Sequence, residues 1–236
     1  MDFFDALNKR RSVRRYTPTP VPDTVIQKAL DAALKAPNSS NLQPWEFYWV
    51  KSPEKKQALV DACLFQGTAK TASHLVVAVA RIDTWKRNRN LLFKQMEETQ
   101  TLSEDNRKDL KAYYFKVIPF LYIQDPFGIL GTLKWIILNM IGLFRPVARG
   151  PAFKKDLIEV VSKTTALACE NFMLAIVAQG YGCCPMEGFD ESRVKKILGL
   201  SSNTHIVMTI SVGEAAPGGV FGPQLRLDPK LVIHEV

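Results

Sequence analysis

KRRSVRRY, from Lys9 to Tyr16, is the stretch that constrains this chain most. It places the hydroxyl of Ser12 among the guanidinium groups of Arg10, Arg11, Arg14 and Arg15. Guanidinium groups present a planar fork of donors that suits phosphate, and a hydroxyl adds one more short donor. The pattern therefore predicts a phosphate site, although a solvated basic end of a helix has the same pattern.

A second stretch, APNSSNLQPWEF, runs from Ala36 to Phe47. Its amides can pair with the edge of a heterocycle, and Pro44 and Trp45 can fix the loop. Taken alone, it is equally an ordinary surface loop. The two stretches in this order predict a site for a phosphorylated aromatic cofactor.

Composition sets the broad class. The chain has 236 residues, of which 47% are hydrophobic and 23% are charged, as in an ordinary globular enzyme. Its net charge of +8 suits nucleic acid, an acidic membrane surface or an anionic cofactor. Because no nucleic-acid-binding signature appears and the basic residues cluster only at 9–15, we predict no nucleic-acid partner.

The cysteines indicate no disulfide framework and no metal site. Cys63, Cys169, Cys183 and Cys184 form no CxxC pair, so we expect buried small hydrophobic side chains. No P-loop or HExxH motif occurs, and His74 precedes an apolar run as a structural histidine would. The first residues lack a secretory pattern, so we expect a cytoplasmic protein.

Hydrophobic periodicity predicts alternating helices and short strands. We expect helices at 2–9, 24–35 (capped by Asp23), 53–64, 103–117, 154–179 and 191–198. We expect strands at 47–50, 75–80 and 204–212, of which the second, LVVAVA, reads as a buried central strand. This order favours one α+β or α/β domain over residues 1–236 around a small sheet.

An apolar insertion interrupts this pattern at about residues 117–148. From Pro126 to Phe144 the only charged residue is Lys134. The glycines and the central charge argue against a bilayer span. We expect a lid or a dimer-packing element that does not span a membrane, with a peripheral membrane contact as the alternative.

KRRSVRRY followed by PNSSNLQPWEF resembles the opening of the nitroreductase family of flavin mononucleotide (FMN) enzymes. GYGCCPMEGFD, from Gly180 to Asp190, is similar to the family's stretch ending in Pro-x-Glu-Gly-Phe. Arg226, in PQLRLDP, lies where the family has a phosphate-binding Arg or Lys. The resemblance runs from Phe3 to about Leu227, except for about Thr84 to Pro151.

This resemblance implies the fold and the site. The implied fold is α+β, with a small mixed, mainly antiparallel sheet flanked by helices, in an intertwined homodimer. The implied FMN-binding residues are Arg10, Arg11, Ser12, Arg14, Asn38, Ser39, Ser40, Asn41, Gln43, Pro185, Met186, Glu187, Gly188 and Arg226.

Within that set the resemblance also implies roles. Arg14 faces the pyrimidine side of the flavin, and Gln43 holds a loop, residues 38–41, that reaches the partner's flavin. A backbone N–H of Glu187 or Gly188 lies near the reactive nitrogen and stabilises charge there, which makes Glu187 the candidate catalytic position. The family's ring-edge Asn and Lys fall on Phe65 and Thr68 in this register.

The implied activity is an FMN-dependent oxidoreductase reaction. NAD(P)H delivers a hydride to the flavin, which reduces a small-molecule acceptor such as a nitroaromatic or a quinone. Two alternatives stay open: a flavin-binding protein without turnover, tethered to a partner or membrane through its insertion, and a specialised reductive enzyme such as a dehalogenase. The sequence does not choose between NADH and NADPH.

Overall fold

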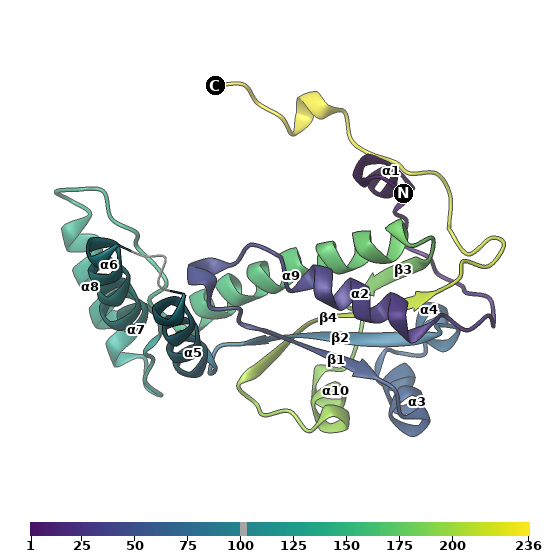
Figure 1. Ribbon diagram of the computed structural model, residues 1–236, viewed down its shortest axis with the longest axis horizontal. Helices are drawn as coiled ribbons and strands as arrows, with labels where there is room; N and C mark the ends of the chain where they lie inside the picture. The colour runs from purple at the N-terminus through teal and green to yellow at the C-terminus, as the bar shows by residue number, and fades with distance from the viewer. Residues whose placement is uncertain (100–102) are drawn as a thin grey trace.

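The computed structural model describes residues 1–99 and 103–236, and a four-stranded sheet is its centre (Figure 1). The strands are β1 (Trp45–Val50), β2 (His74–Arg81), β3 (Gly182–Met186) and β4 (Thr204–Gly213). They lie in the order β1-β2-β4-β3, and each neighbouring pair is antiparallel. The α+β prediction is confirmed, whereas the expected mixed sheet is not, because among the described residues the only parallel pairing is a bridge between Ser12 and Cys183 outside the named strands.

The central strand β2 is apolar because both of its faces are covered. Val76 and Ala78 face one hydrophobic cluster, together with α2 (Asp23–Ala33) and α9 (Lys154–Ala178). Leu75, Val77 and Val79 face a second cluster, together with α3 (Pro53–Ala62) and α10 (Glu191–Leu198). The helices therefore form one layer on each face of the sheet (Figure 1).

Helix α9 is the principal core helix. It packs against all four strands and against α2 and α1 (Phe3–Lys9). By length and composition it could cross a membrane, but half of its most apolar window is buried inside the protein. Its apolar character is therefore explained by the core.

Local signals explain where several helices begin and end. The Ser52 side chain accepts a hydrogen bond from the Lys55 N–H, and Pro53 occupies the first turn of α3. Asp190 caps α10 in the same way, and Gly199, at φ 68°, ends it in the left-handed region.

A helical lobe stands at one end of the sheet (Figure 1). It contains α5 (Trp85–Glu98), α6 (Glu104–Ala112), a π-helical turn at Tyr113–Val117, α7 (Ile118–Tyr122) and α8 (Ile129–Ile141). Trp85, Phe93, Tyr114 and Ile118 form its core with Leu157 of α9. The apolar insertion therefore forms α7 and α8, and the expected helix at 103–117 is divided into α6, capped by Ser103, and the π-helical turn.

Several element predictions were wrong in detail. Asp23 does not cap α2, which instead begins after Pro22 without a side-chain cap. Strand β3, helix α5 and the short helix α4 (Gly67–Lys70) were not predicted. The other expected helices and strands are present within about three residues of their predicted ends. All four cysteines are buried and free, as expected.

Candidate functional site

Residues 10–16 form an extended segment laid against the sheet. Ser12 pairs with Cys183 of β3, and the Val13 N–H donates to the Cys183 carbonyl at 3.1 Å. Val13 and Tyr16 point into the core, where each is at most 5% exposed. Ser12 and Arg14 are the neighbours of the inward-facing Val13 and therefore lie on the outer side of this extended segment, where Ser12 is half-buried and Arg14 is exposed.

Tyr16 anchors the segment. Its hydroxyl lies 2.8 Å from the Ser211 Oγ of β4, and Thr68 bonds both to that Ser211 hydroxyl and to the Val13 carbonyl. Burial raises the pKa of Tyr16 well above its usual value, so the phenol stays neutral and keeps its proton for this network.

The chain after β4 forms the opposite wall. The Arg14 N–H donates to the Gly219 carbonyl at 2.6 Å, and Arg11 Nη2 donates to the Gly222 carbonyl at 2.5 Å. A Cβ on Gly219 would collide with the Arg15 carbonyl oxygen, so only glycine permits this close approach. These contacts bring residues 220–226 beside KRRSVRRY.

Between the two walls lies a cavity of about 410 Å³, here called the arginine cavity. Its lining is Arg10, Arg11, Ser12, Arg14, Val220, Phe221, Pro223, Gln224, Leu225 and Arg226. None of these residues is acidic, and the nearest ion pair is the long one of 4.0 Å between Arg10 Nε and Glu170 Oε1. Within the described residues no carboxylate comes closer than 4.0 Å to these four guanidinium groups, and together with the hydroxyl they form a donor set that fits a phosphate.

The end of β3 lies close to the same segment. Gln66 Nε2 donates to the Gly188 carbonyl at 2.6 Å, and Gly67 packs near the Arg14 carbonyl. Within the described part of the chain, the backbone N–H groups of Glu187 and Gly188 have no hydrogen-bond acceptor. They are therefore free to donate to a bound group. The Met186 side chain is buried in the core, which leaves only its backbone for such a site.

Gln66 is a candidate site residue that lies beside the positions selected from the sequence but out of step with them. The expected register pointed to Phe65 and Thr68, but Thr68 is buried and bonds inside the core. Leu64 and Phe65 both have positive φ values, 57° and 55°, and the tight turn that they form brings Gln66 to Gly188. Neither Leu64 nor Phe65 is a glycine, so the sequence carries no signal for their left-handed backbone.

The loop Asn38–Gln43 holds a strained backbone. Ser40, Asn41 and Gln43 have φ values of 57°, 52° and 47°, in the left-handed region that non-glycine residues rarely adopt. Such strain persists only where the surroundings impose it, and it often accompanies function. The main-chain N–H of Gln43 donates to the Asn38 side chain at 2.8 Å, which closes the loop.

The helical lobe holds this loop from outside. The Tyr113 hydroxyl lies 2.7 Å from the Ser40 hydroxyl, and the Tyr114 hydroxyl donates to the Ser40 carbonyl at 3.0 Å. Asn88 of α5 donates to the carbonyls of Leu42 and Gln43. The lobe therefore helps to fix the conformation of the loop.

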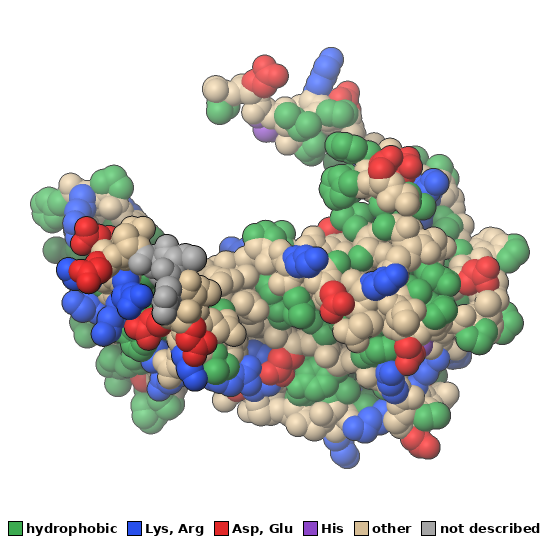
Figure 2. Space-filling model, viewed as in Figure 1, with side chains coloured by type: hydrophobic (Ala, Val, Ile, Leu, Met, Phe, Trp, Pro, Cys, Tyr) green, Lys and Arg blue, Asp and Glu red, His purple; other side chains and the backbone are tan. Residues whose placement is uncertain are grey.

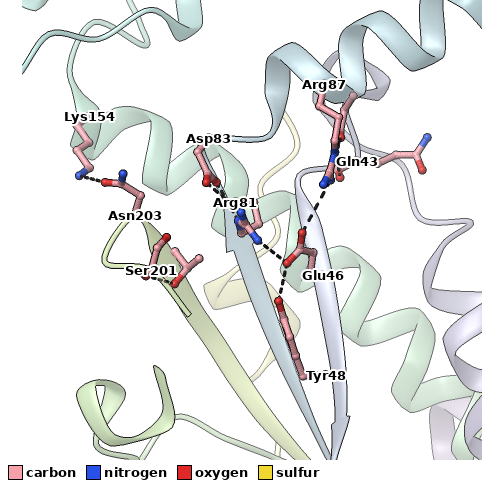
Figure 3. A network of polar contacts seen from close by, with 11 residues as sticks. Gln43, Glu46, Tyr48, Arg81, Asp83, Arg87, Lys154, Ser201 and Asn203 are labelled. Carbon is pink, nitrogen blue, oxygen red and sulfur yellow. Dashed lines mark hydrogen bonds and ion pairs between the residues drawn. The ribbon is translucent and has the colours of Figure 1, made fainter. Parts of the chain in front are cut away.

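An ion-pair network fixes the strand end beside the loop (Figure 3). The Arg81 N–H donates to the Pro44 carbonyl at 2.8 Å, and its guanidinium bonds to Glu46 at 2.6 Å and to Asp83 at 2.9 and 3.0 Å. The Asp83 carboxylate and Glu46 raise the pKa of Arg81, and the Arg81 guanidinium lowers that of Asp83. Figure 3 shows Tyr48 and Arg87 converging on the same Glu46 carboxylate.

The loop and the arginine cavity lie at opposite ends of the sheet. The cavity adjoins Cys183, which pairs with Val212, whereas the loop enters β1 at Trp45, next to the end of β2 that pairs with His205. Seven residues of strand separate Val212 from His205, or roughly 20 Å at 3.3 Å per residue. One chain therefore brings together Arg10, Arg11, Ser12, Arg14 and Arg226, but not residues 38–43.

Comparison with known proteins gives this arrangement a context. The profile of the nitroreductase family matches residues 7–214, which is most of the chain. The similarity includes KRRSVRRY, the loop at 38–43 and the end of β3.

Individual relatives share the full length. The chain is 28% identical over 231 residues to an NADH dehydrogenase of Thermus thermophilus, covering 97% of this chain and 94% of the relative. It is 27% identical over 234 residues to YdgI of Bacillus subtilis, named as an NAD(P)H nitroreductase, covering 96% and 95%. A solved structure from Exiguobacterium sibiricum, named as a nitroreductase in complex with FMN, shares the fold with a TM-score of 0.74 at 22% identity, covering 100% of this chain and 98% of that one.

Proposed function

This chain belongs to the nitroreductase family of flavin-dependent NAD(P)H oxidoreductases, and from that premise we propose that it works as a cytoplasmic homodimer that binds FMN. In this proposal NAD(P)H reduces the flavin, and the flavin then reduces a small-molecule acceptor such as a nitroaromatic or a quinone.

The arginine cavity carries the proposal. Arg10, Arg11, Ser12 and Arg226 would hold the FMN phosphate, since they line one cavity and none of its lining residues is acidic. Charge-assisted hydrogen bonds to phosphate are roughly twice as strong as neutral ones. Arg10, which has only a 4.0 Å contact to Glu170, is free to turn toward an anion.

The ring of FMN would lie on the Arg14 and Gly188 side of the cavity. When bound, FMN supplies a ring that accepts a hydride and passes it on. Arg14 places a positive charge on this side, and the free N–H groups of Glu187 and Gly188 provide donors for negative charge on the ring. Gln66 positions Gly188 and offers its amide to the ring edge.

The proposal of a homodimer is supported by the part of the candidate site that one chain lacks. The strained loop at 38–43 lies roughly 20 Å along the sheet from the arginine cavity, so we propose that it serves the cavity of a second chain. Phe3 and Phe4 of α1 are exposed, and the chain after Gly222 runs past α1 and away from the body with exposed Leu225, Leu227 and Ile233 (Figure 1). Apolar side chains on such an arm favour packing against a partner.

Two measurements on the purified protein test the activity. Its absorption spectrum should show bound oxidised flavin, and anaerobic titration with NADPH or NADH should bleach that spectrum. Adding a quinone or a nitroaromatic should then restore it with turnover. Bleaching without reoxidation by any acceptor would support the flavin-binding alternative, and a protein that neither holds nor takes up FMN would refute the proposal.

A further inference from the structure

Helix α8 exposes its apolar side chains and buries its only charge. Ile129, Leu133, Trp135, Ile136, Ile137 and Met140 are all exposed, whereas Lys134 is only 7% exposed. The face directed toward the lobe consists of Gly131, Lys134 and Leu138. This is the reverse of the usual arrangement on a helix at a protein surface.

Specific contacts fix this orientation. Lys134 Nζ donates to the carbonyl of Ile123 at 2.5 Å and to that of Leu121 at 3.4 Å, at the C-terminal end of α7. A cation is favourable at that end of a helix, where carbonyl groups lack partners. At the start of α8, the Asp125 carboxylate accepts from the N–H groups of Ile129 and Leu130. These contacts therefore hold the exposed apolar side chains of α8 outward.

Two exposed phenylalanines flank the helix. Phe127 is 86% exposed before α8, and Phe144 is 85% exposed after it. With Trp135 they give this end of the lobe three exposed aromatic residues, and aromatic side chains are enriched at the boundary between lipid headgroups and acyl chains. We call α8 together with Phe127 and Phe144 the apolar face.

Basic residues accompany the apolar face. Residues 113–153 contain Lys116, Lys134, Arg145 and Arg149 but a single acidic residue, Asp125, which is engaged as a helix cap. Helix α6 carries acidic and basic residues in equal number and so adds no excess of basic residues. Figure 2 shows basic, acidic and hydrophobic side chains together on the lobe, so the basic excess belongs to residues 113–153 and not to the lobe as a whole. The charge therefore complements anionic lipid headgroups.

We propose that the apolar face is a peripheral docking surface for an anionic lipid bilayer. With 13 residues, α8 is about 20 Å long, which is too short for the roughly 30 Å hydrocarbon core. The helix therefore lies in the plane of the interface, with its apolar side chains among the acyl chains and Lys116 and Arg145 at the headgroups.

A second copy of the chain is a less suitable occupant. A twofold interface across this face would bring Lys116, Arg145 and Arg149 close to their own counterparts without an unengaged acidic residue from 113–153 to offset them. The exposed α1 lies at the other end of α9, the C-terminal arm runs past it, and both provide apolar surface for a dimer (Figure 1).

The test is flotation of the full-length, FMN-supplemented protein with vesicles of phosphatidylcholine and phosphatidylglycerol in equal amounts, compared with phosphatidylcholine alone. We expect stronger partition onto the anionic vesicles, weakened by added salt. The double variants Leu133→Asp/Ile136→Asp and Lys116→Glu/Arg145→Glu should each reduce partition at least about tenfold. Leu34→Asp and Lys55→Glu, at exposed positions outside the lobe, are the matched controls and should bind as the wild type does.

Tryptophan fluorescence reports the contact itself. Trp45 and Trp85 are each 7% exposed, and the partly buried Trp49 lies on β1 outside the lobe. Trp135 is 51% exposed on α8, so a blue shift on vesicle binding should disappear in Trp135→Phe. Absence of binding to anionic vesicles, or equal binding by wild type and both double variants, would overturn the proposal. So would a loss of mass in sedimentation velocity for Leu133→Asp/Ile136→Asp, since the face would then join two copies.

Discussion

Gln66 donates a hydrogen bond of 2.6 Å from its amide nitrogen to the carbonyl oxygen of Gly188, and this bond joins two segments that are 122 residues apart. One is the turn at 64–67, which also packs against Arg14, and the other follows β3. The bond sets the position of the two free N–H groups at Glu187 and Gly188. Gln66 therefore both orients the donors and forms part of the surface that would meet a ring.

Gln66→Ala should weaken FMN binding about tenfold, because it removes a hydrogen bond that orients the donors and an amide at the ring edge. Titration of the apoprotein with FMN, followed by quenching of flavin fluorescence, measures the effect. Gln57→Ala is the control, since Gln57 makes a comparable side-chain bond to Asp61 on α3, away from the cavity. Equal FMN affinity in Gln66→Ala and wild type would remove this residue from the site.

Arg10→Ala and Arg226→Ala should each weaken FMN binding by about tenfold or more, because a hydrogen bond to a charged group contributes about 1.5–3 kcal/mol. Arg15→Ala is a sharp control, since Arg15 belongs to the same KRRSVRRY stretch but does not line the arginine cavity. If all three variants lose the same affinity, the effect is one of overall charge and the phosphate assignment is wrong.

A shared site predicts complementation between two defective chains. Arg10→Ala damages the cavity, and Asn41→Ala damages the loop, so each homodimer should bind FMN poorly. Co-expressed chains should form mixed dimers, in which one of the two sites has an intact cavity and an intact loop. After random pairing about half of the dimers are mixed, so about a quarter of all sites are intact. Flavin content of dimers selected through two different tags measures this. A site built within one chain would show no recovery.

Much of the fold could be predicted because local patterns agree with it. LVVAVA at 75–80 is continuously apolar since both faces of β2 are covered, and Ser52 with Pro53 gives a clear helix start. Strand β3, with the sequence GCCPM, was missed because glycine and proline weaken every strand signal. It is a strand because it pairs with β4 and receives Ser12.

The part of the candidate site that could be predicted is the part whose residue types suit a ligand directly. Four arginines and Ser12 predict a phosphate site from the sequence. The fold places Arg10, Arg11, Ser12 and Arg14 in one cavity with Arg226, and leaves Arg15 outside its lining. Gln66 was not predictable, because two residues with positive φ shift the register of its turn. The outward direction of α8 was expected only under the alternative of a peripheral membrane contact, since an apolar run normally marks a buried face and the contacts of Lys134 and Asp125 reverse it.

Asp83→Asn should lower the stability at neutral pH by about 1 kcal/mol, or about 2–4 °C in Tm, after allowance for the exposure of this ion pair. Its hydrogen bonds with Arg81 lower the pKa of Asp83, so the folded state binds fewer protons than the unfolded chain near that pKa. The ionised Asp83 carboxylate therefore stabilises the folded state above the ordinary aspartate pKa of about 4. This stabilisation is lost as pH falls through the lower pKa that Asp83 has in the folded state.

The measurement for Asp83 is thermal unfolding of wild type and variant from pH 7 to pH 3. The gap in Tm should narrow below about pH 4. The control Glu97→Gln, at an exposed position on α5, should have the same Tm as the wild type at neutral pH. A gap for Asp83→Asn that stays constant to pH 3 would mean that lost packing, and not the charge of Asp83, explains the variant.

Lys134→Met separates two physical accounts of the helical lobe. A purely hydrophobic account predicts that methionine, of similar length, stabilises a position that is 7% exposed. Burial does lower the pKa of Lys134, which shows that its charge carries a desolvation cost. The variant, however, leaves the carbonyls of Leu121 and Ile123 without their donor, at a cost of about 1–3 kcal/mol.

We therefore expect Lys134→Met to lower Tm and to speed amide hydrogen exchange in α7 and α8, while the exposed control Lys116→Met changes neither. An increase in Tm for Lys134→Met would show that desolvation exceeds hydrogen bonding at this site, and that the end of α7 does not need the lysine to orient α8.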